Sequence, residues 1–255
     1  MSTATFHDLK GASVFITGGG SGIGAALTEG FLRQGAKVAF VGRSDASGFV
    51  DRMEEETGSR PLFIQCDITD TEALQGAIAE SAAAHGPVTV LVNNAANDQR
   101  HETLEVSEEF WDWSQAVNLK AYFFACQAVI PAMRQAGGGA IINFTSISYM
   151  LGNAGYPAYT TANSGLNGMT RSLAREFGPD RIRVNALAPG WVLTEKQLEM
   201  WATPEALAAH MERQCLKEHL KPQDIVDATL FLASGASRMI TGQSLAVDGG
   251  VVATG

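Results

Sequence analysis

The sequence predicts an α/β fold, a doubly wound parallel sheet of about seven strands with helices on both faces. Short β-branched apolar runs alternate with longer stretches of helical periodicity over the whole chain, which indicates a repeated strand–helix unit. The apolar runs are nearly continuous, as in strands that are buried on both faces of a sheet. A glycine-rich turn follows the first run directly, and this narrows the class to the Rossmann type.

The first half of the chain predicts four of the strands. Their β-branched and apolar residues favour strands at "SVFIT" (13–17), "KVAFV" (37–41), "PLFIQ" (61–65) and "VTVLVN" (88–93). The periodicity of the segments between them predicts helices from about Ile23 to Gln34, near 46–57 and near 71–84.

The second half predicts the remaining strands. A long helix from about Val117 to Gln135 leads to a strand at "GAIINFTS" (139–146), and a second long helix after Pro157 leads to "IRVNALA" (182–188). The last strand is expected at "SLAVDGG" (244–250). No low-complexity linker or internal repeat divides residues 1–255, so a single domain is expected.

Composition and charge exclude several classes of protein. The net charge is −9, whereas a nucleic-acid-binding protein is expected to carry a basic face, so no nucleic-acid partner is predicted. The three cysteines are far apart and the five histidines lack metal-ligand spacing, so neither a disulfide framework nor a metal site is indicated. Free thiols favour a cytoplasmic location. No run of about 18 apolar residues occurs, and no membrane span is predicted.

The glycine-rich turn "TGGGSGIG", Thr17 to Gly24, carries the first functional prediction. Glycines let a backbone turn tightly and approach a pyrophosphate, while the following helix offers free N–H groups to that anion. The spacing is Gly18, Gly22 and Gly24 rather than the common G-x-G-x-x-G. An ordinary Gly-rich turn is the alternative, but the position between a strand and a helix favours a dinucleotide site.

This spacing resembles that of the short-chain dehydrogenase/reductase family, and further motifs extend the resemblance over almost the whole chain. "NNAA" (93–96) is similar to the family's N-N-A-G, with Ala96 in place of the glycine. Asn118 in "VNL" stands at the active-site asparagine, Ser146 precedes Tyr159 by the family's usual interval, and "PGWVLT" (189–194) resembles P-G-x-V-x-T. The length fits the short, single-domain branch.

The resemblance implies a nicotinamide cofactor and the residues that bind it. These are Gly18, Ser21, Gly22, Ile23, Gly24, Asp67, Ile68, Asn94, Ala95, Pro189, Gly190, Val192 and Thr194. An acidic residue normally ends the second strand and binds the adenosine ribose, but Gly42 and then Arg43 stand there. A guanidinium pairs with a 2′-phosphate, so the sequence favours NADP, with NAD as the alternative.

The family resemblance also implies the catalytic residues. Tyr159 is the expected acid/base, Ser146 hydrogen-bonds the substrate oxygen, and Asn118 holds a water that relays protons. The family's lysine, four residues after the tyrosine on the same helix face, is replaced by Asn163. A unit charge about 5 Å away at an effective dielectric near 20 is worth roughly 3 kcal/mol, or about 2 pKa units. An assembled but slowed site is therefore expected.

Two rival functions remain open. A dinucleotide-binding protein without turnover, serving as a sensor or scaffold, is one, because Asn163 lacks the charge of the lysine. The retention of Ser146, Tyr159 and Asn118 favours an enzyme. An epimerase or dehydratase of the family's extended branch is the other, but the chain is too short for that branch's substrate domain and the glycine spacing is wrong.

The substrate prediction also comes from the resemblance. "NNAANDQRH" (93–101), "GAIINFTSISYMLG" (139–152) and "QCLKEHLKPQDI" (214–225) resemble the sugar (aldose) dehydrogenases of the family. A sugar needs several polar groups in a cleft, and the candidates are Asn97, Asp98, His101, Ser148, Tyr149, Asn153 and Trp191. Residues 195–216 resemble a helical lid over the substrate. The long helix at 157–178 implies a homotetramer or a dimer, by analogy with the family.

Overall fold

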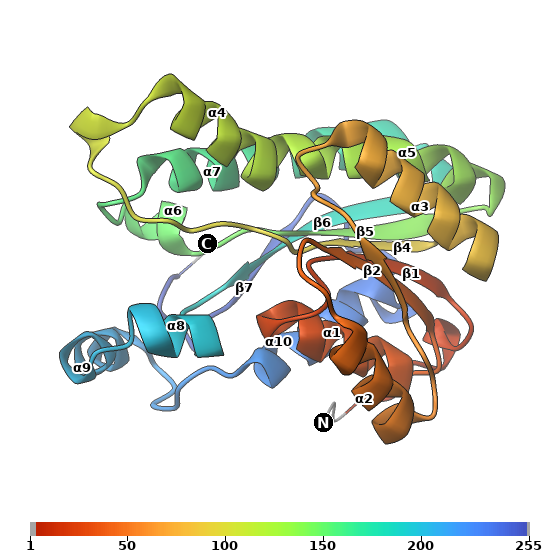
Figure 1. The fold of residues 1–255 in the computed structure, drawn as a ribbon, viewed down its shortest axis with the longest axis horizontal. Coiled ribbons are helices and arrows are strands. Elements are labelled where there is room, and N and C mark those ends of the chain that lie inside the picture. The colour runs from red at the N-terminus through yellow and green to blue at the C-terminus, as the bar shows by residue number, and fades with distance from the viewer. Residues whose placement is uncertain (1–3, 254–255) are drawn as a thin grey trace.

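The computed structural model describes residues 4–253 and is built on one seven-stranded sheet (Figure 1). The strands are β1 (Ser13–Thr17), β2 (Lys37–Gly42), β3 (Leu62–Gln65), β4 (Val90–Asn93), β5 (Gly139–Phe144), β6 (Ile182–Pro189) and β7 (Ser244–Val247). Their order is β3-β2-β1-β4-β5-β6-β7 and every pair is parallel. The predicted fold class is confirmed. The strand order changes direction between β1 and β4, where parallel sheets open a crevice at the carboxyl ends of their strands.

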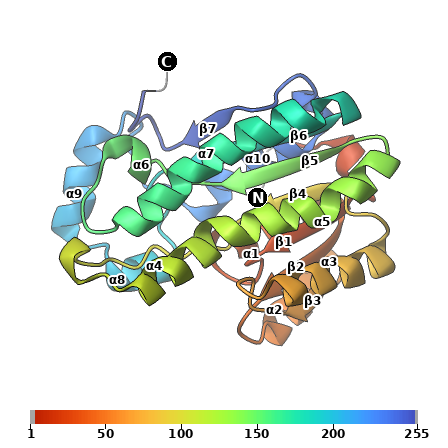
Figure 2. The ribbon, with the colours of Figure 1, turned by 90° about the horizontal axis from the view of Figure 1, so that it is seen from above.

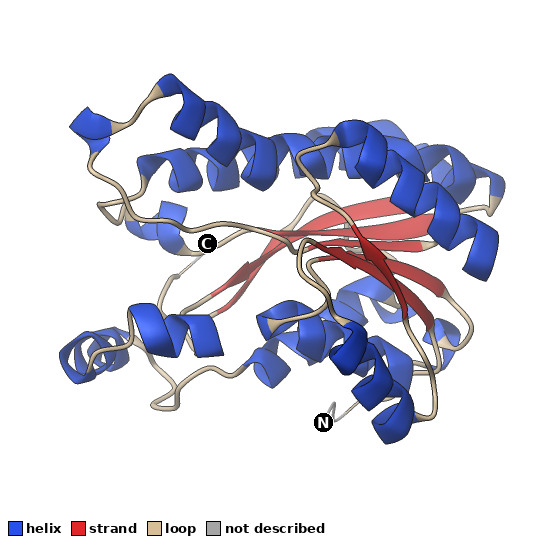
Figure 3. Cartoon of the chain, viewed as in Figure 1, coloured by secondary structure: helices blue, strands red, loops and turns tan. Residues whose placement is uncertain are grey.

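Helices cover both faces of this sheet, as the view coloured by secondary structure shows (Figure 3). One face carries α1 (Gly22–Arg33), α2 (Ser47–Thr57) and α10 (Pro222–Ala233). Leu27 and Phe31 of α1 and Ile225 and Leu230 of α10 are fully buried there. The sequence predictions place no helix at 222–233, although Pro222 stands at its first position and the apolar residues recur at helical spacing.

The opposite face carries α3 (Thr71–His85), α5 (Ala121–Gln135) and α7 (Pro157–Phe177). Figure 2 shows α5 and α7 running side by side over β4, β5 and β6. Apolar side chains of α3 and α5, such as Leu74 and Met133, meet the sheet in a second core cluster. The predicted ranges of α1, α2, α3 and α7 agree with these helices to within two residues.

The helix before β5 starts earlier than the sequence predicts. It is continuous from α4 (Glu108–Gln115) through a π-helical turn, η3 (Ala116–Lys120), into α5. Ser107 caps its start, because its hydroxyl accepts from the Phe110 N–H at 3.2 Å. By length and composition this 28-residue helix could cross a membrane, a test that the core helix of a soluble protein also passes.

Two predicted strands end early. β5 ends at Phe144, so Ser146 lies beyond the strand, and β7 ends at Val247. The Asp248 carboxylate accepts from the N–H groups of Gly250 and Val252, at 2.8 Å each, and turns the chain away from the sheet. A turn that satisfies these amides locally removes them from the ladder.

Short helices complete the described chain. They are α6 (Ser148–Leu151), α8 (Glu195–Met200), α9 (Pro204–Arg213) and the 3₁₀ turns η1 (His7–Leu9), η2 (Thr103–Glu105), η4 (Gly178–Asp180) and η5 (Gly235–Ser237). α6, α8 and α9 lie together beyond one end of the sheet (Figure 1). The expected lid segment, 195–216, therefore contains α8 and α9, and its role as a lid stays a prediction.

Candidate active site

A cleft of about 970 Å³ lies where the strands end, and it collects most of the residues predicted from the sequence. The predicted residues that line it are Gly18, Ser21, Ile23, Gly24, Arg43, Asp67, Ile68, Asn94, Ala95, Asn97, Asp98, Ser146, Ser148, Asn153, Tyr159, Pro189, Gly190, Trp191, Val192 and Thr194. Those that do not line it are Gly22, His101, Asn118, Tyr149 and Asn163. Segments far apart in sequence thus meet in one site.

The glycine-rich turn after β1, Gly18 to Gly24, is closely packed, and we call it the glycine cradle. A Cβ added at Gly24 would lie 1.9 Å from the Gly18 carbonyl oxygen, and Gly18 itself has φ +70°. Ser21, the N-cap of α1, makes no side-chain cap hydrogen bond. The first amides of the helix therefore remain available to an anion. These features fit the pyrophosphate of a dinucleotide.

The far end of the cleft, at the ends of β2 and β3, carries both signs of charge. Arg43 is exposed and follows β2, as the sequence predicts. Asp45 also lines the cleft there, a carboxylate that the sequence predictions do not include. Its Oδ1 accepts from the Ser47 hydroxyl at 2.6 Å and the Ser47 N–H at 3.0 Å, and these bonds lower the pKa of Asp45.

Tyr159 lies in the first turns of α7, half-buried at the opposite end of the cleft. Its ring stacks on that of Tyr156, with 5.7 Å between centroids. Burial, and then the negative charge of Asp98, raise the pKa of Tyr159 to about 12, although the side chains of Asn163 and Ser146 act to lower it. A phenol in this state stays protonated at neutral pH.

Asn163 lies one turn further along α7 and does not face the cleft. Its side chain is buried, with 2% exposed, and its Nδ2 donates to the Tyr159 carbonyl oxygen at 2.8 Å. The amide is thus bound to its own helix, and it also acts to lower the pKa of the Tyr159 phenol, but it brings no positive charge as a lysine would. Nothing in the spacing of the sequence gives this orientation.

Asn118 sits in the π-helical turn η3 and holds the loop after β4. Its Oδ1 accepts from the Asn97 N–H at 2.8 Å, while its Nδ2 donates to the Asn97 carbonyl at 3.0 Å. π-helical turns are frequent at functional sites. Asn118 therefore fixes the backbone of Asn97, and the water relay that the resemblance implies stays a prediction.

The end of the cleft beside α8 and α9 is rich in polar and aromatic side chains, several of which the sequence predictions do not include. Gln197 of α8 donates through Nε2 to Asp98 Oδ2 at 2.9 Å, and its Oε1 accepts from Trp191 Nε1 at 2.8 Å. Three buried polar atoms here lack a hydrogen-bond partner among the described residues: Ser148 Oγ, Trp201 Nε1 and His210 Nε2. Buried polar groups are nearly always paired, with protein groups or with ordered water.

Comparison with known proteins places this geometry in a family. The family model described as enoyl-(acyl carrier protein) reductase matches residues 18–252. The chain is 49% identical to the probable galactose dehydrogenase GalD of Rhizobium meliloti, over 98% of this chain and 99% of that protein. The chain belongs to the short-chain dehydrogenase/reductase family. The sequence resemblance is thereby confirmed, and this short-chain dehydrogenase/reductase is an oxidoreductase of a family that binds nicotinamide dinucleotides.

Further relatives align with nearly the whole chain. A D-xylose 1-dehydrogenase of Caulobacter vibrioides is 46% identical over 98% of this chain and 99% of that protein. Among solved structures, a Beutenbergia cavernae protein described as an NAD(P) dependent gluconate 5-dehydrogenase, with bound NADP, is 36% identical with a TM-score of 0.90. The alignment covers 96% of this short-chain dehydrogenase/reductase and 98% of that chain.

Proposed function

We propose that this short-chain dehydrogenase/reductase oxidises a sugar, with Tyr159 as the acid/base and NADP as the preferred cofactor. The observation that carries the proposal is that one cleft joins the glycine cradle to Tyr159 and Ser146. The names of the galactose and xylose dehydrogenases among its relatives support a sugar as the substrate.

The polar side chains that line the cleft favour a polyhydroxy substrate. Asn97, Ser146 and Asn153 offer hydrogen-bonding groups there, and sugar hydroxyls both donate and accept. A site built to hydrogen-bond hydroxyl groups rejects an analogue that lacks them, because its own buried groups then stay unpaired. A steroid or fatty acyl chain offers few groups that could pair with these side chains.

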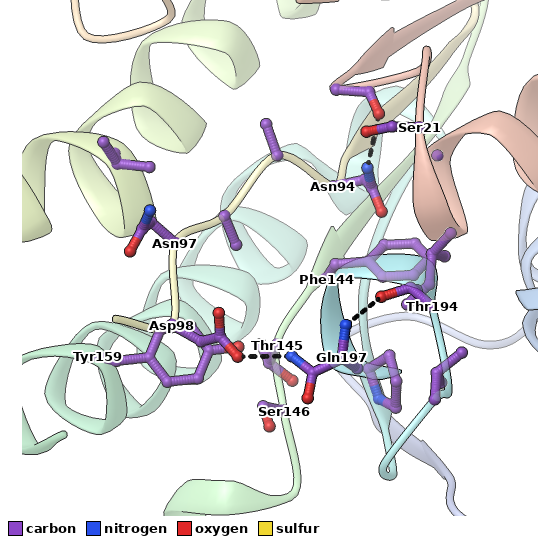
Figure 4. Close-up of a pocket in the computed structure, with 18 of the residues that line it drawn as sticks. Ser21, Asn94, Asn97, Asp98, Phe144, Thr145, Ser146, Tyr159, Thr194 and Gln197 are labelled. Atoms are coloured by element: carbon purple, nitrogen blue, oxygen red, sulfur yellow. Dashed lines mark hydrogen bonds between the residues drawn. The ribbon is translucent and has the colours of Figure 1, made fainter. Parts of the chain in front are cut away.

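The residues of this chain divide the chemistry between them. The phenolate form of Tyr159 takes the proton of the substrate hydroxyl, and Ser146, which lies close to it in Figure 4, donates to the same oxygen. The nicotinamide, when bound, supplies the acceptor for the hydride that leaves the carbon bearing this hydroxyl. Since Asn163 carries no charge and burial disfavours the phenolate, we expect the proton transfer to be slow near neutral pH.

NADP is proposed because of the side chains at the end of β2. Arg43 offers a guanidinium where a ribose-binding carboxylate is absent, and Gly42 leaves room beside it. Asp45 is the competing feature, but its Oδ1 is engaged by Ser47.

A cofactor-binding protein without turnover is the second candidate, favoured by the orientation of Asn163. Mixing the protein with NADP⁺ or NAD⁺ and a panel of aldoses, and following the absorbance of the reduced cofactor at pH 7 and pH 10, separates the two. Turnover that Tyr159→Phe abolishes supports the enzyme. Cofactor binding with no turnover at either pH would leave the sensor or scaffold.

We also propose self-association through the outer faces of α5 and α7, as a dimer or homotetramer. The two helices run side by side at the surface (Figure 2), and Phe123 of α5 is 43% exposed. Light scattering on the purified protein tests this, and a monomeric mass would contradict it.

A further inference from the structure

Asp98 places a carboxylate at the Tyr159 end of the cleft, and the chemistry proposed above gives it no role. It comes from the loop after β4, and its side chain is 23% exposed. The other carboxylates that line the cleft, among the described residues, are Asp45 and Asp67, which follow β2 and β3 at the far end.

The lid holds this carboxylate in place through both of its oxygens. Lys196 Nζ donates to Oδ1 at 2.9 Å, and Gln197 Nε2 donates to Oδ2 at 2.9 Å. Burial acts to raise the pKa of Asp98, but the bonds to Lys196 and Gln197 outweigh it and lower the pKa. Asp98 is therefore an oriented anion at neutral pH.

The carboxylate keeps unused acceptor capacity on the side of the cleft. Two carboxylate oxygens offer about four lone-pair sites, and the lid occupies one on each oxygen. Asp98 lines the cleft whereas Lys196 does not, so Lys196 holds the carboxylate from outside. Figure 4 shows the Asp98–Gln197 bond at the end of the cleft that also contains Tyr159 and Ser146.

The position of Asp98 opposes the ionisation that catalysis requires. Its charge raises the pKa of Tyr159, so a neutral residue would serve the proton transfer better. A contact that only holds residues 195–216 against the loop after β4 does not need a charge beside the acid/base either. A charge at this place is explained if it binds the substrate more strongly than a neutral group, as hydrogen bonds to ions do.

We propose that Asp98 is a specificity-determining residue, whose carboxylate accepts from the sugar hydroxyl next to the reacting carbon. Lys196 and Gln197 are then positioning residues that orient it. The inference rests on the proposed sugar oxidation and adds to it the hydroxyl group that the site requires.

The test compares a sugar with its 2-deoxy analogue in an isosteric variant, Asp98→Asn. The probe is D-galactose or D-xylose, whichever the protein binds, and binding is measured by calorimetry on the protein saturated with NADP⁺, together with kcat/KM. The control is Asp180→Asn, which removes the same charge from a surface pair with Arg134, at 2.6 Å and away from the cleft.

We expect the unchanged protein and Asp180→Asn to prefer the sugar over its 2-deoxy analogue by about 10- to 100-fold, the effect of a hydrogen bond to a charged group. In Asp98→Asn the preference should fall to about threefold or less, through weaker sugar binding, while the affinity for NADP⁺ stays the same. An equal loss for both sugars, or an unchanged preference, would overturn the proposal.

A second variant keeps the test possible if Asp98→Asn fails to fold. Lys196→Met leaves the carboxylate but removes its anchor, and Lys196 is half-exposed, so the fold should tolerate the change. The preference should again decrease, and an unchanged preference counts against the proposal. Failure of the proposed function would give a different result, in which the unchanged protein binds NADP⁺ but neither aldose. The role proposed for Asp98 would then be wrong as well.

Discussion

Asn163, which does not line the cleft, donates its amide to the backbone carbonyl of Tyr159 at 2.8 Å. Where the family resemblance implies a lysine, this chain has a neutral amide, which acts to lower the pKa of the phenol but carries no charge. The rate of proton transfer in this chain therefore depends on what else stabilises the phenolate, and the predictions below start from that point.

Restoring the charge should restore the rate. In Asn163→Lys, a cation about 5 Å from the phenol lowers its pKa by about 2 units, and we expect kcat at pH 7 to rise by about 10- to 100-fold. Asn163→Met is the control, because methionine is about as long as lysine but uncharged, and its kcat at pH 7 should not rise. An equal gain in both variants, or none in Asn163→Lys with normal cofactor binding, would show that the missing charge is not the cause.

The unchanged protein should need alkaline conditions. The pKa of Tyr159 is raised to about 12, so its protonated form is favoured and the phenolate fraction increases about tenfold with each pH unit below that value. The initial rate of sugar oxidation should therefore climb steadily from pH 7 to pH 10. Tyr159→Phe should be inactive throughout this range. A plateau below pH 9 in the unchanged protein would contradict the raised pKa.

Cofactor choice should depend on Arg43. Arg43→Ala removes the guanidinium proposed to pair with the 2′-phosphate, so the dissociation constant for NADP⁺ should increase by about 10- to 100-fold while that for NAD⁺ changes little. Arg52→Ala in α2, which loses an exposed arginine paired with Glu56, should leave both constants unchanged. Calorimetry measures them directly, and equal weakening of NADP⁺ and NAD⁺ would argue for NAD as the natural cofactor.

The parts of the structure that the sequence predicts well are those that repeat. Apolar runs such as "SVFIT" give β1 without error, and the strand–turn–helix order places Gly18 and Gly24 in the cleft. These features are local, so spacing along the chain is sufficient to find them. The early start of α4 is missed although Ser107 caps it and Phe110 and Trp113 recur at helical spacing, because the prediction began the helix only at Val117.

The contacts of the site are less accessible to such reasoning because they join distant segments. Asp98 and Lys196 are 98 residues apart, and no motif connects them. The direction of the Asn163 amide and the unpartnered Trp201 and His210 atoms depend on how packed helices meet. Sequence spacing and the family resemblance predict many of the residues that reach the cleft, whereas their hydrogen-bond partners require the packed structure.

The glycine cradle gives the last prediction, which concerns stability. In Gly24→Ala the new methyl group would lie 1.9 Å from the Gly18 carbonyl oxygen and 2.8 Å from Asn94 Nδ2. Both are held in place, because Asn94 Nδ2 donates to the Thr17 carbonyl at 3.0 Å. The turn must shift, so the free energy of unfolding in urea should fall by roughly 1–3 kcal/mol, and NADP⁺ binding should weaken with it.

Gly48→Ala provides the matched control for this substitution. Gly48 lies in α2, and a Cβ there meets nothing within 4 Å. The same added methyl group should stabilise the protein by roughly 0.5–1 kcal/mol, because alanine loses less backbone freedom in a helix. Equal unfolding free energies for the two variants would mean that the turn after β1 adapts to a side chain, and the close approach of backbone to pyrophosphate proposed for it would then lack a structural basis.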